Sequence, residues 1–230
     1  MATTKVKKKS KEIALILCLS LVACGIIGYF DGFAPIPYLY KACGKICLFV
    51  GTPLLYWKLC PHFSYRPLFR LEKEPLFLAG MLGCAVLFLI LGTYFLLGAF
   101  LDLSAVTGEL EERMNINKSN FIAVAVYIAV CNSFLEEFFF RGFLFFRLKA
   151  LSTGMFAHLA SSIIFSLYHV AIMVTWFDWW VFAVCILALV VGGVIFNFLD
   201  EKTESLYPSW LTHGCANIAI NSIGMFLFYG

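Results

Sequence analysis

The residues whose types and spacing could do chemistry in this chain are charged groups placed in apolar surroundings. Glu136, Glu137 and Arg141 stand in the stretch 131–147, which is otherwise rich in phenylalanine. A buried charge is costly unless it is paired, hydrated or used in chemistry. Glu137 and Arg141 are four residues apart, so on a helix they share a face and can form an ion pair. Glu136 points about 100° away from Glu137, which leaves its carboxylate free to act as an acid or a base.

Two histidines and an asparagine are the other candidates. His169 follows Phe165 by four residues in an apolar run, and His213 and Asn217 have the same spacing near the C-terminus. That spacing puts His213 and Asn217 in one polar stripe on a helix. Taken singly, each has a plainer interpretation. A buried histidine is often a hydrogen-bonded packing residue, and polar stripes often join helices in membrane bundles.

The composition shows what surrounds these residues. The chain has 230 residues, of which 62% are hydrophobic and 13% are charged, and its mean hydropathy is +0.89. Soluble domains carry about 25% charged residues, so the chain is predicted to be a membrane protein. Its nine cysteines fall mostly in apolar runs, where cysteine behaves as a small hydrophobic residue.

Long apolar runs predict an all-α fold, a polytopic transmembrane bundle of about seven to eight helices. The second run contains Lys41, Lys45 and Pro53, which are unusual in a span. The tetrapeptide at 21–24 resembles a lipoprotein cleavage box, but the apolar run continues beyond it, so we expect an uncleaved first helix. The predicted spans cover 13–30, 38–59, 76–100, 121–148, 155–174, 179–199 and 207–228.

The charges suggest an orientation and a division of the chain. Lysines cluster between positions 5 and 11, and basic residues accumulate on the cytoplasmic side of spanning helices. We therefore expect residues 1–12 to be a basic cytoplasmic N-terminus and residues 13–230 to be a single transmembrane domain. The loop 58–73 would also be cytoplasmic, the acidic segment 102–112 external, and the C-terminus external. A nucleic-acid partner is not expected, because the apolar run begins directly after the lysines.

Depth in the membrane connects the candidates. Counted from the cytoplasmic helix ends at 1.5 Å per residue, Glu136, His169 and Asn217 all lie roughly 15 to 21 Å deep, with His213 about one turn shallower. Side chains that serve only local packing have no reason to share a depth. The sequence therefore predicts that three helices present Glu, His, His and Asn to one cavity, with Asn132 one turn before Glu136 as a further donor to it.

Taken together, these motifs resemble a known family. Glu136, Glu137 and Arg141, then Phe165 with His169, then His213 with Asn217, are similar to the EExxxR, FxxxH and HxxxN signatures of the CPBP family. That family, also called Abi, comprises CAAX prenyl proteases and bacteriocin-processing intramembrane proteases. The resemblance covers about 119–230 and has all three motifs in order.

The resemblance implies an intramembrane endopeptidase. Glu136 would activate a water as general base, His169, His213 and Asn217 would orient that water and stabilise the oxyanion, and Glu137 with Arg141 would fix Glu136. A metalloprotease is the alternative, with zinc held by His169, His213 and Glu136. Asparagine is an unusual zinc ligand and a good oxyanion donor, which favours the metal-free mechanism.

Two other classes of protein remain alternatives. A transporter or proton relay would also contain buried polar groups, but these would be spread over several depths. A non-catalytic immunity or scaffold protein could keep the same residues for structure alone. As partners we expect the lipid bilayer and a peptide or membrane-protein substrate, of CAAX type or from peptide maturation or immunity. A bacterial cytoplasmic membrane is the expected location.

Overall fold

The chain is a bundle of helices in the computed structural model, which describes residues 2–34, 36–60 and 64–230. These described ranges contain no β-strand. The long helices are α1 (Ala2–Phe33), α2 (Tyr38–Leu59), α3 (Lys73–Leu97), α8 (Gly154–Met173), α9 (Trp179–Thr203) and α10 (Tyr207–Tyr229). Their ends agree with the predicted spans to within a few residues, except that α1 begins well before the first predicted span. The predicted span 121–148 is one continuous helical run built from α5 (Phe121–Tyr127), η3 (Ile128–Asn132), α6 (Ser133–Glu137), η4 (Phe138–Phe145) and α7 (Phe146–Leu151).

Within the described residues, six helical segments are long and apolar enough to cross a membrane. They are α1, α3, the run from α5 to α7, α8, α9 and α10, so the protein is a multi-pass helical membrane protein, as predicted. Helix α2, which carries Lys41, Lys45 and Pro53, is not among the six, yet it is 22 residues long and lies against α1 and the central run. Lys41 and Lys45 lower the mean hydropathy of α2. Both are buried inside the protein, so neither charge faces lipid.

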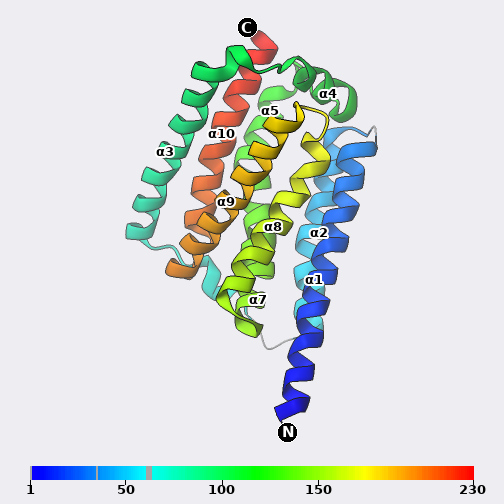
Figure 1. Cartoon of the computed structure of the whole chain (residues 1–230), viewed down its shortest axis with the longest axis vertical. Coiled ribbons are helices and arrows are strands. Elements are labelled where there is room, and N and C mark those ends of the chain that lie inside the picture. The colour runs from blue at the N-terminus through cyan, green and yellow to red at the C-terminus, as the bar shows by residue number, and fades with distance from the viewer. Residues whose placement is uncertain (1, 35, 61–63) are drawn as a thin grey trace.

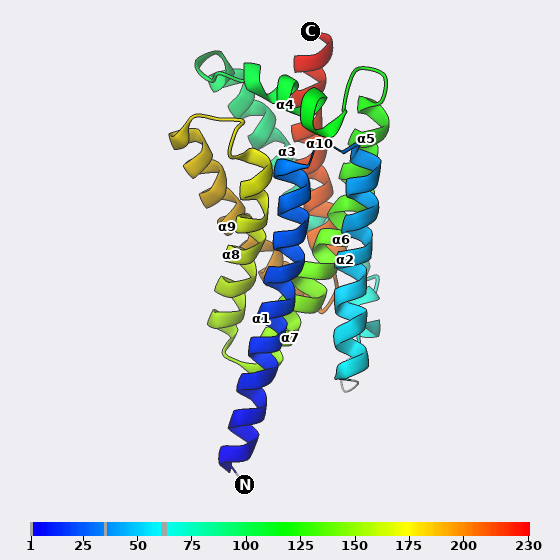
Figure 2. The same ribbon diagram turned by 90° about the vertical axis from the view of Figure 1, so that its right-hand side faces the viewer.

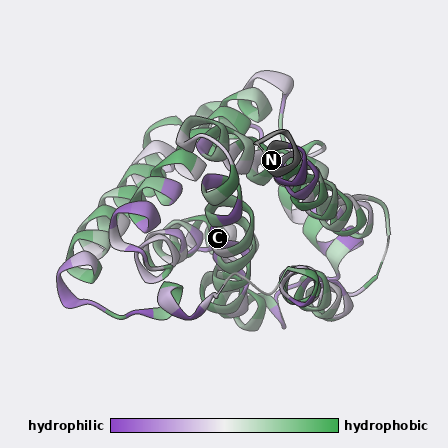
Figure 3. Cartoon of the chain, turned by 90° about the horizontal axis from the view of Figure 1, so that it is seen from below, coloured by the Kyte–Doolittle hydropathy of each residue, from purple (hydrophilic) through white to green (hydrophobic). Residues whose placement is uncertain are grey.

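The central run from α5 to α7 is surrounded by the other helices. Helix α3 lies along α10, α8 packs against α9, and α1 contacts both α2 and α8 (Figures 1 and 2). The N- and C-termini lie at opposite ends of the bundle (Figure 1). Most residues of the helices are hydrophobic in the view from below, which is coloured by residue hydropathy (Figure 3). This composition suits helices in contact with lipid.

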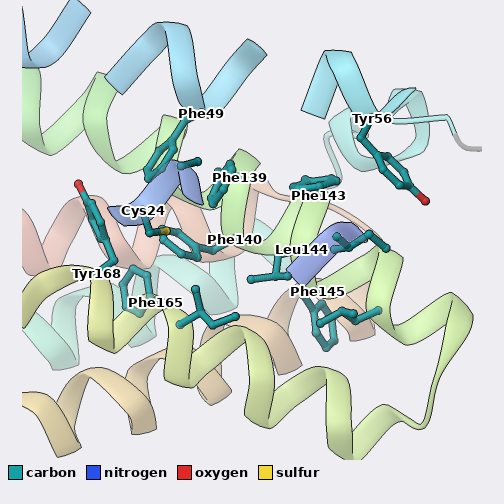
Figure 4. Close-up of a cluster of buried hydrophobic side chains, with 14 of the residues drawn as sticks. Cys24, Phe49, Tyr56, Phe139, Phe140, Phe143, Leu144, Phe145, Phe165 and Tyr168 are labelled. Carbon is teal, nitrogen blue, oxygen red and sulfur yellow. The ribbon is translucent and has the colours of Figure 1, made fainter. Parts of the chain in front are cut away.

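Aromatic side chains fill the interior between α1, α2, α8 and the central run (Figure 4). Phe49 of α2 stacks on Phe139 with ring centroids 4.2 Å apart, and Phe140 meets Phe165 of α8 edge to face at 5.2 Å. Aromatic pairs in these arrangements add about 0.5–1.5 kcal/mol beyond the area that they bury. This packing fixes the height at which α2 and α8 meet the central run, and therefore the height of their polar residues.

The central run differs from the predicted regular helix in two places. Both η3 and η4 are π-helical. A π turn inserts an extra residue, so it shifts the side-chain register and leaves backbone carbonyl oxygens open to other donors. Helix α10 supplies such donors: Trp210 Nε1 donates to Val130 O at 2.9 Å, and Asn221 Nδ2 donates to Ala125 O at 3.0 Å.

The acidic segment predicted as an external loop contains a short helix, α4 (Ser104–Met114). It ends at Asn115, which adopts the left-handed conformation with φ of 53°, a common way to end a helix. The following Ile116 packs with Met114, Phe121 and Phe228. Helix α4 therefore covers the end of the bundle at which the chain terminates.

Candidate active site

The candidate site lies inside the bundle, where α2, the central run, α8 and α10 meet. Glu136 comes from α6, His169 from α8 and His213 from α10. Glu136 is only 2% exposed, so its carboxylate interacts with protein groups on nearly every side. The two carboxylate oxygens have different partners, and this difference defines the site.

Oxygen Oε1 of Glu136 is held by two hydrogen bonds and a nearby cation. Asn132 Nδ2 donates to it at 2.8 Å and the Tyr168 hydroxyl at 3.4 Å. Lys45 Nζ, from α2, forms an ion pair with it at 3.6 Å. The contact with Asn132 confirms the predicted position of that residue. Together these contacts fix the rotation of the carboxylate and neutralise part of its charge.

Oxygen Oε2 of Glu136 faces the two histidines. His213 Nε2 lies 3.7 Å and His169 Nε2 lies 3.8 Å from it. The predicted convergence of the three side chains from three helices is thus confirmed as geometry. His213, which the count along the helix places about one turn shallower, reaches the same carboxylate oxygen with its side chain.

Hydrogen bonds at the other ring nitrogens fix the histidine tautomers. His169 Nδ1 is 2.8 Å from Phe165 O, and His213 Nδ1 is 2.7 Å from Glu137 Oε1. A carbonyl or carboxylate oxygen only accepts, so each Nδ1 carries the proton and donates. In a neutral ring, Nε2 then has a free lone pair. In both rings Nε2 is the nitrogen that lies near Glu136 Oε2.

The ion pair of Glu137 and Arg141 is also confirmed. Arg141 Nη1 lies 3.2 Å from Glu137 Oε1, and both side chains are fully buried. The guanidinium of Arg141 is placed between two aromatic rings, 4.3 Å from the centroid of Phe165 and 5.0 Å from that of Phe196. Such cation–π contacts compensate for lost hydration. Phe165 therefore stabilises Arg141, and Glu137 Oε1 holds both Arg141 and His213.

Among the described hydrogen bonds, none joins the Asn217 side chain to Glu136 or to either histidine. Its Nδ2 donates to Ile128 O of the π turn η3 at 3.3 Å. Gly214 lies on the same side of α10, since a Cβ added there would come within 3.0 Å of Ala129 O. Asn217 therefore joins α10 to the central run, and its role as an oxyanion donor stays a prediction.

Sequence reasoning missed two groups of the site, Lys45 and Tyr168. The sequence identified Lys45 only as an unusual charge in the second span, and it did not single out Tyr168. A lysine inside an apolar helix is itself a signal of function. Pairing it with Glu136, 91 residues away in sequence, requires the packing of α2, which no spacing rule gives.

The zinc alternative requires His169, His213 and Glu136 to converge on one metal ion. Zinc binds nitrogen and carboxylate oxygen at about 2.0–2.2 Å. Across the described part of the chain, no three His, Cys, Asp or Glu side chains form a group that could hold a metal ion. We therefore derive no reaction step through zinc.

These features define a class: a multi-pass helical membrane protein with a buried carboxylate facing two histidines. Residues 118–219 match the family model described as type II CAAX prenyl endopeptidase Rce1-like. Residues 118–219 are therefore similar to an Rce1-like CAAX protease domain, in agreement with the predicted family. The matched segment begins one residue before the predicted start at 119, ends at 219 rather than 230, and contains all three motifs. No curated protein and no solved structure matches the chain.

Proposed function

We propose that the protein is an intramembrane endopeptidase that hydrolyses a peptide bond with a water activated by Glu136. The observation that carries this proposal is the asymmetry of the Glu136 carboxylate, with Oε1 fixed by donors and Oε2 facing the Nε2 atoms of His169 and His213. Separations of 3.7 and 3.8 Å are too long for direct hydrogen bonds, but a water beside these atoms would donate one proton to Oε2 and the other to one of the two Nε2 atoms.

Each side chain then has a defined part in the reaction. Glu136 Oε2 accepts one proton of the water as the oxygen attacks the peptide carbonyl carbon, and the Nε2 lone pair of His169 orients the water by accepting its other proton in a hydrogen bond. When the tetrahedral intermediate collapses, the carbon–nitrogen bond breaks and Glu136 returns the proton to the leaving amine. The balance is one water consumed and two peptide ends released.

His213 is the histidine best placed to stabilise the oxyanion. Its Nδ1 donates to the Glu137 carboxylate, which fixes the orientation of the ring. Stabilisation of the oxyanion by His213 would require a proton on Nε2, so in this proposal His169 and not His213 accepts from the water. Donation by Asn217 requires its side chain to leave Ile128 O.

The family suggests which substrate to test first. An Rce1-like domain is described as that of a CAAX prenyl endopeptidase, so a prenylated peptide ending in a CAAX sequence is our proposed substrate class. The prenyl chain would partition into the bilayer and bring the peptide to a site that is itself surrounded by membrane helices.

The decisive experiment compares cleavage of quenched fluorogenic peptides, prenylated and unprenylated, by the purified protein in lipid nanodiscs. Glu136→Gln removes the base while keeping the shape of the side chain, and we expect at least a 100-fold loss of kcat. Glu109→Gln is the matched control, because Glu109 belongs to α4 and pairs only with Arg113 among the contacts described. Equal cleavage by Glu136→Gln and the unchanged protein would exclude Glu136 as the base.

A chelator tests the metal alternative in the same assay. Cleavage that persists after chelation supports the glutamate mechanism. Loss of cleavage that added zinc restores would instead assign a metalloprotease, with His169, His213 and Glu136 as the first ligands to substitute.

A further inference from the structure

Lys45 is a buried cation that contacts the candidate site from outside the segment matched to the family. It belongs to α2 and is 7% exposed. Its Nζ donates to Asn132 Oδ1 at 2.9 Å and lies 3.6 Å from Glu136 Oε1. The same ammonium lies 5.2 Å from the centroid of the Tyr168 ring. Asn132, Glu136 and Tyr168 all lie in the matched segment 118–219, whereas Lys45 lies outside it.

Lys45, Asn132 and Glu136 form a closed set of contacts. Asn132 accepts from Lys45 through Oδ1 and donates to Glu136 through Nδ2. An ammonium group only donates, so Lys45 forces Asn132 to present its oxygen to α2. The amide nitrogen of Asn132 is thereby directed at Glu136 Oε1. Lys45 controls the carboxylate both directly, by charge, and through the orientation of the amide.

This control determines which oxygen of Glu136 reacts. With Oε1 occupied by Lys45, Asn132 and Tyr168, only Oε2 is available to the histidines. Without Lys45, the Asn132 amide could turn over and the carboxylate could rotate. A misplacement of about 1 Å at a reacting group can cost roughly 100-fold in rate.

Lys41 is a second buried lysine in α2, and its described hydrogen bond goes to a backbone oxygen and not to the candidate site. It lies one turn before Lys45 on the same face and is similarly buried. Its Nζ donates to the backbone oxygen of Asp31, near the end of α1, where helices favour cations. It makes no described contact with Glu136, so it is a natural control.

We propose that Lys45 is a positioning residue for Glu136, and that α2 supports the candidate site through this one side chain. This inference rests on the proposed function. Lys45 acts through Glu136 and Asn132, so its loss should lower turnover and leave substrate binding nearly unchanged.

The first test compares Lys45→Met with Lys41→Met in the nanodisc cleavage assay. Methionine has nearly the length of lysine and lacks the charge. We expect Lys45→Met to lower kcat by about 10- to 100-fold with KM changed by less than about twofold. Lys41→Met should keep kcat within about twofold. Lys45→Arg, which keeps a cation, should recover part of the loss. Equal kcat for the two methionine variants would overturn the proposal.

The second test does not depend on activity. Thermal unfolding is measured for Lys45→Met, Glu136→Gln and the double variant. Lys45→Met leaves the Glu136 charge uncompensated and should lower Tm, and adding Glu136→Gln should restore part of that loss. The same cycle with Lys41→Met should be additive. Additivity in the Lys45 cycle would contradict the direct contact with Glu136.

The two tests separate failure of this inference from failure of the proposed function. If Glu136→Gln abolishes cleavage while Lys45→Met does not lower kcat, the protease assignment stands and the role of Lys45 is wrong. If the unchanged protein cleaves none of the peptides, the proposed function is contradicted for that substrate class. The unfolding cycle alone then decides whether Lys45 fixes Glu136.

Discussion

Two pairs of residues in this chain have the same glutamate–arginine spacing and different environments. Glu137 and Arg141 are fully buried, whereas the side chains of Glu109 and Arg113 are 21% and 41% exposed. Removing one member of a buried pair leaves an unpaired charge inside the protein, and removing one member of an exposed pair leaves a charge in water. Two ion pairs with the same spacing in sequence can therefore contribute very differently to the free energy of unfolding.

We expect Arg141→Met to destabilise the protein by about 3–5 kcal/mol, because the buried Glu137 carboxylate would lose its cation and keep only the hydrogen bond from His213. Arg113→Met is the matched control and should cost about 1 kcal/mol or less, even though Arg113 also donates to Gly32 O. Chemical unfolding in detergent micelles measures both. Equal losses of free energy of unfolding would contradict the role assigned to burial.

At the scale of the elements, α8 and α9 approach closely through one glycine. A Cβ added to Gly193 would lie 2.9 Å from Ser162 Cβ and 3.0 Å from Ser162 Cα. The preceding Gly192 has open space, with nothing within 4 Å of an added Cβ. Small residues allow helices in membranes to approach at such distances. Helix α8 also carries His169, so this contact helps to place the histidine.

The pair of glycines gives a prediction about α8. Gly193→Ala must move the backbone of α8 or α9, and we expect a lower Tm and at least a several-fold loss of cleavage through displacement of His169. Gly192→Ala should leave Tm unchanged or raise it slightly, because alanine favours helix by about 1 kcal/mol over glycine. Differential scanning fluorimetry and the peptide assay check both variants. An unchanged Tm and unchanged cleavage for Gly193→Ala would show that α8 and α9 can accommodate the added methyl group without displacing His169.

Much of the fold and part of the site could be predicted from the sequence. Helix positions follow from the apolar runs, and the Glu137–Arg141 pair follows from helical periodicity. The π turns could not be predicted, because their carbonyl oxygens accept from other helices: Val130 and Ile128 in η3 from α10, and Phe140 in η4 from Ser161 of α8. Lys45 and Tyr168 join the site through tertiary packing, which spacing along one helix does not encode. Asn217 was assigned to the cavity by its depth and by the face that it shares with His213, and neither shows that its amide donates to Ile128 O.

At the scale of the whole molecule, the termini and the charged loops indicate one orientation. The N-terminus and the segment Arg66–Phe69 lie at one end of the bundle, and α4 lies at the other with the C-terminus (Figure 1). The basic residues of the N-terminal segment and of the 64–73 connection are thus on one side. We propose that this side is cytoplasmic.

Epitope tags test this orientation. A tag at the N-terminus should be digested by added protease only in inside-out vesicles, and a tag at the C-terminus only in right-side-out vesicles. Cells permeabilised with detergent provide the control in which both tags are digested. Digestion of both tags on the same side would contradict the arrangement in which the termini lie at opposite ends.

The stack of Phe49 on Phe139, together with the reach of Lys45 to Glu136, has a consequence for engineering. The segment that carries the recognisable motifs is not a self-contained module, since α2 completes both its interior and its charge balance. A chimera that grafts residues 118–219 onto the front half of another membrane protein would inherit the motifs and lose their counterion. Transplants should therefore keep α2 and the central run together as one unit.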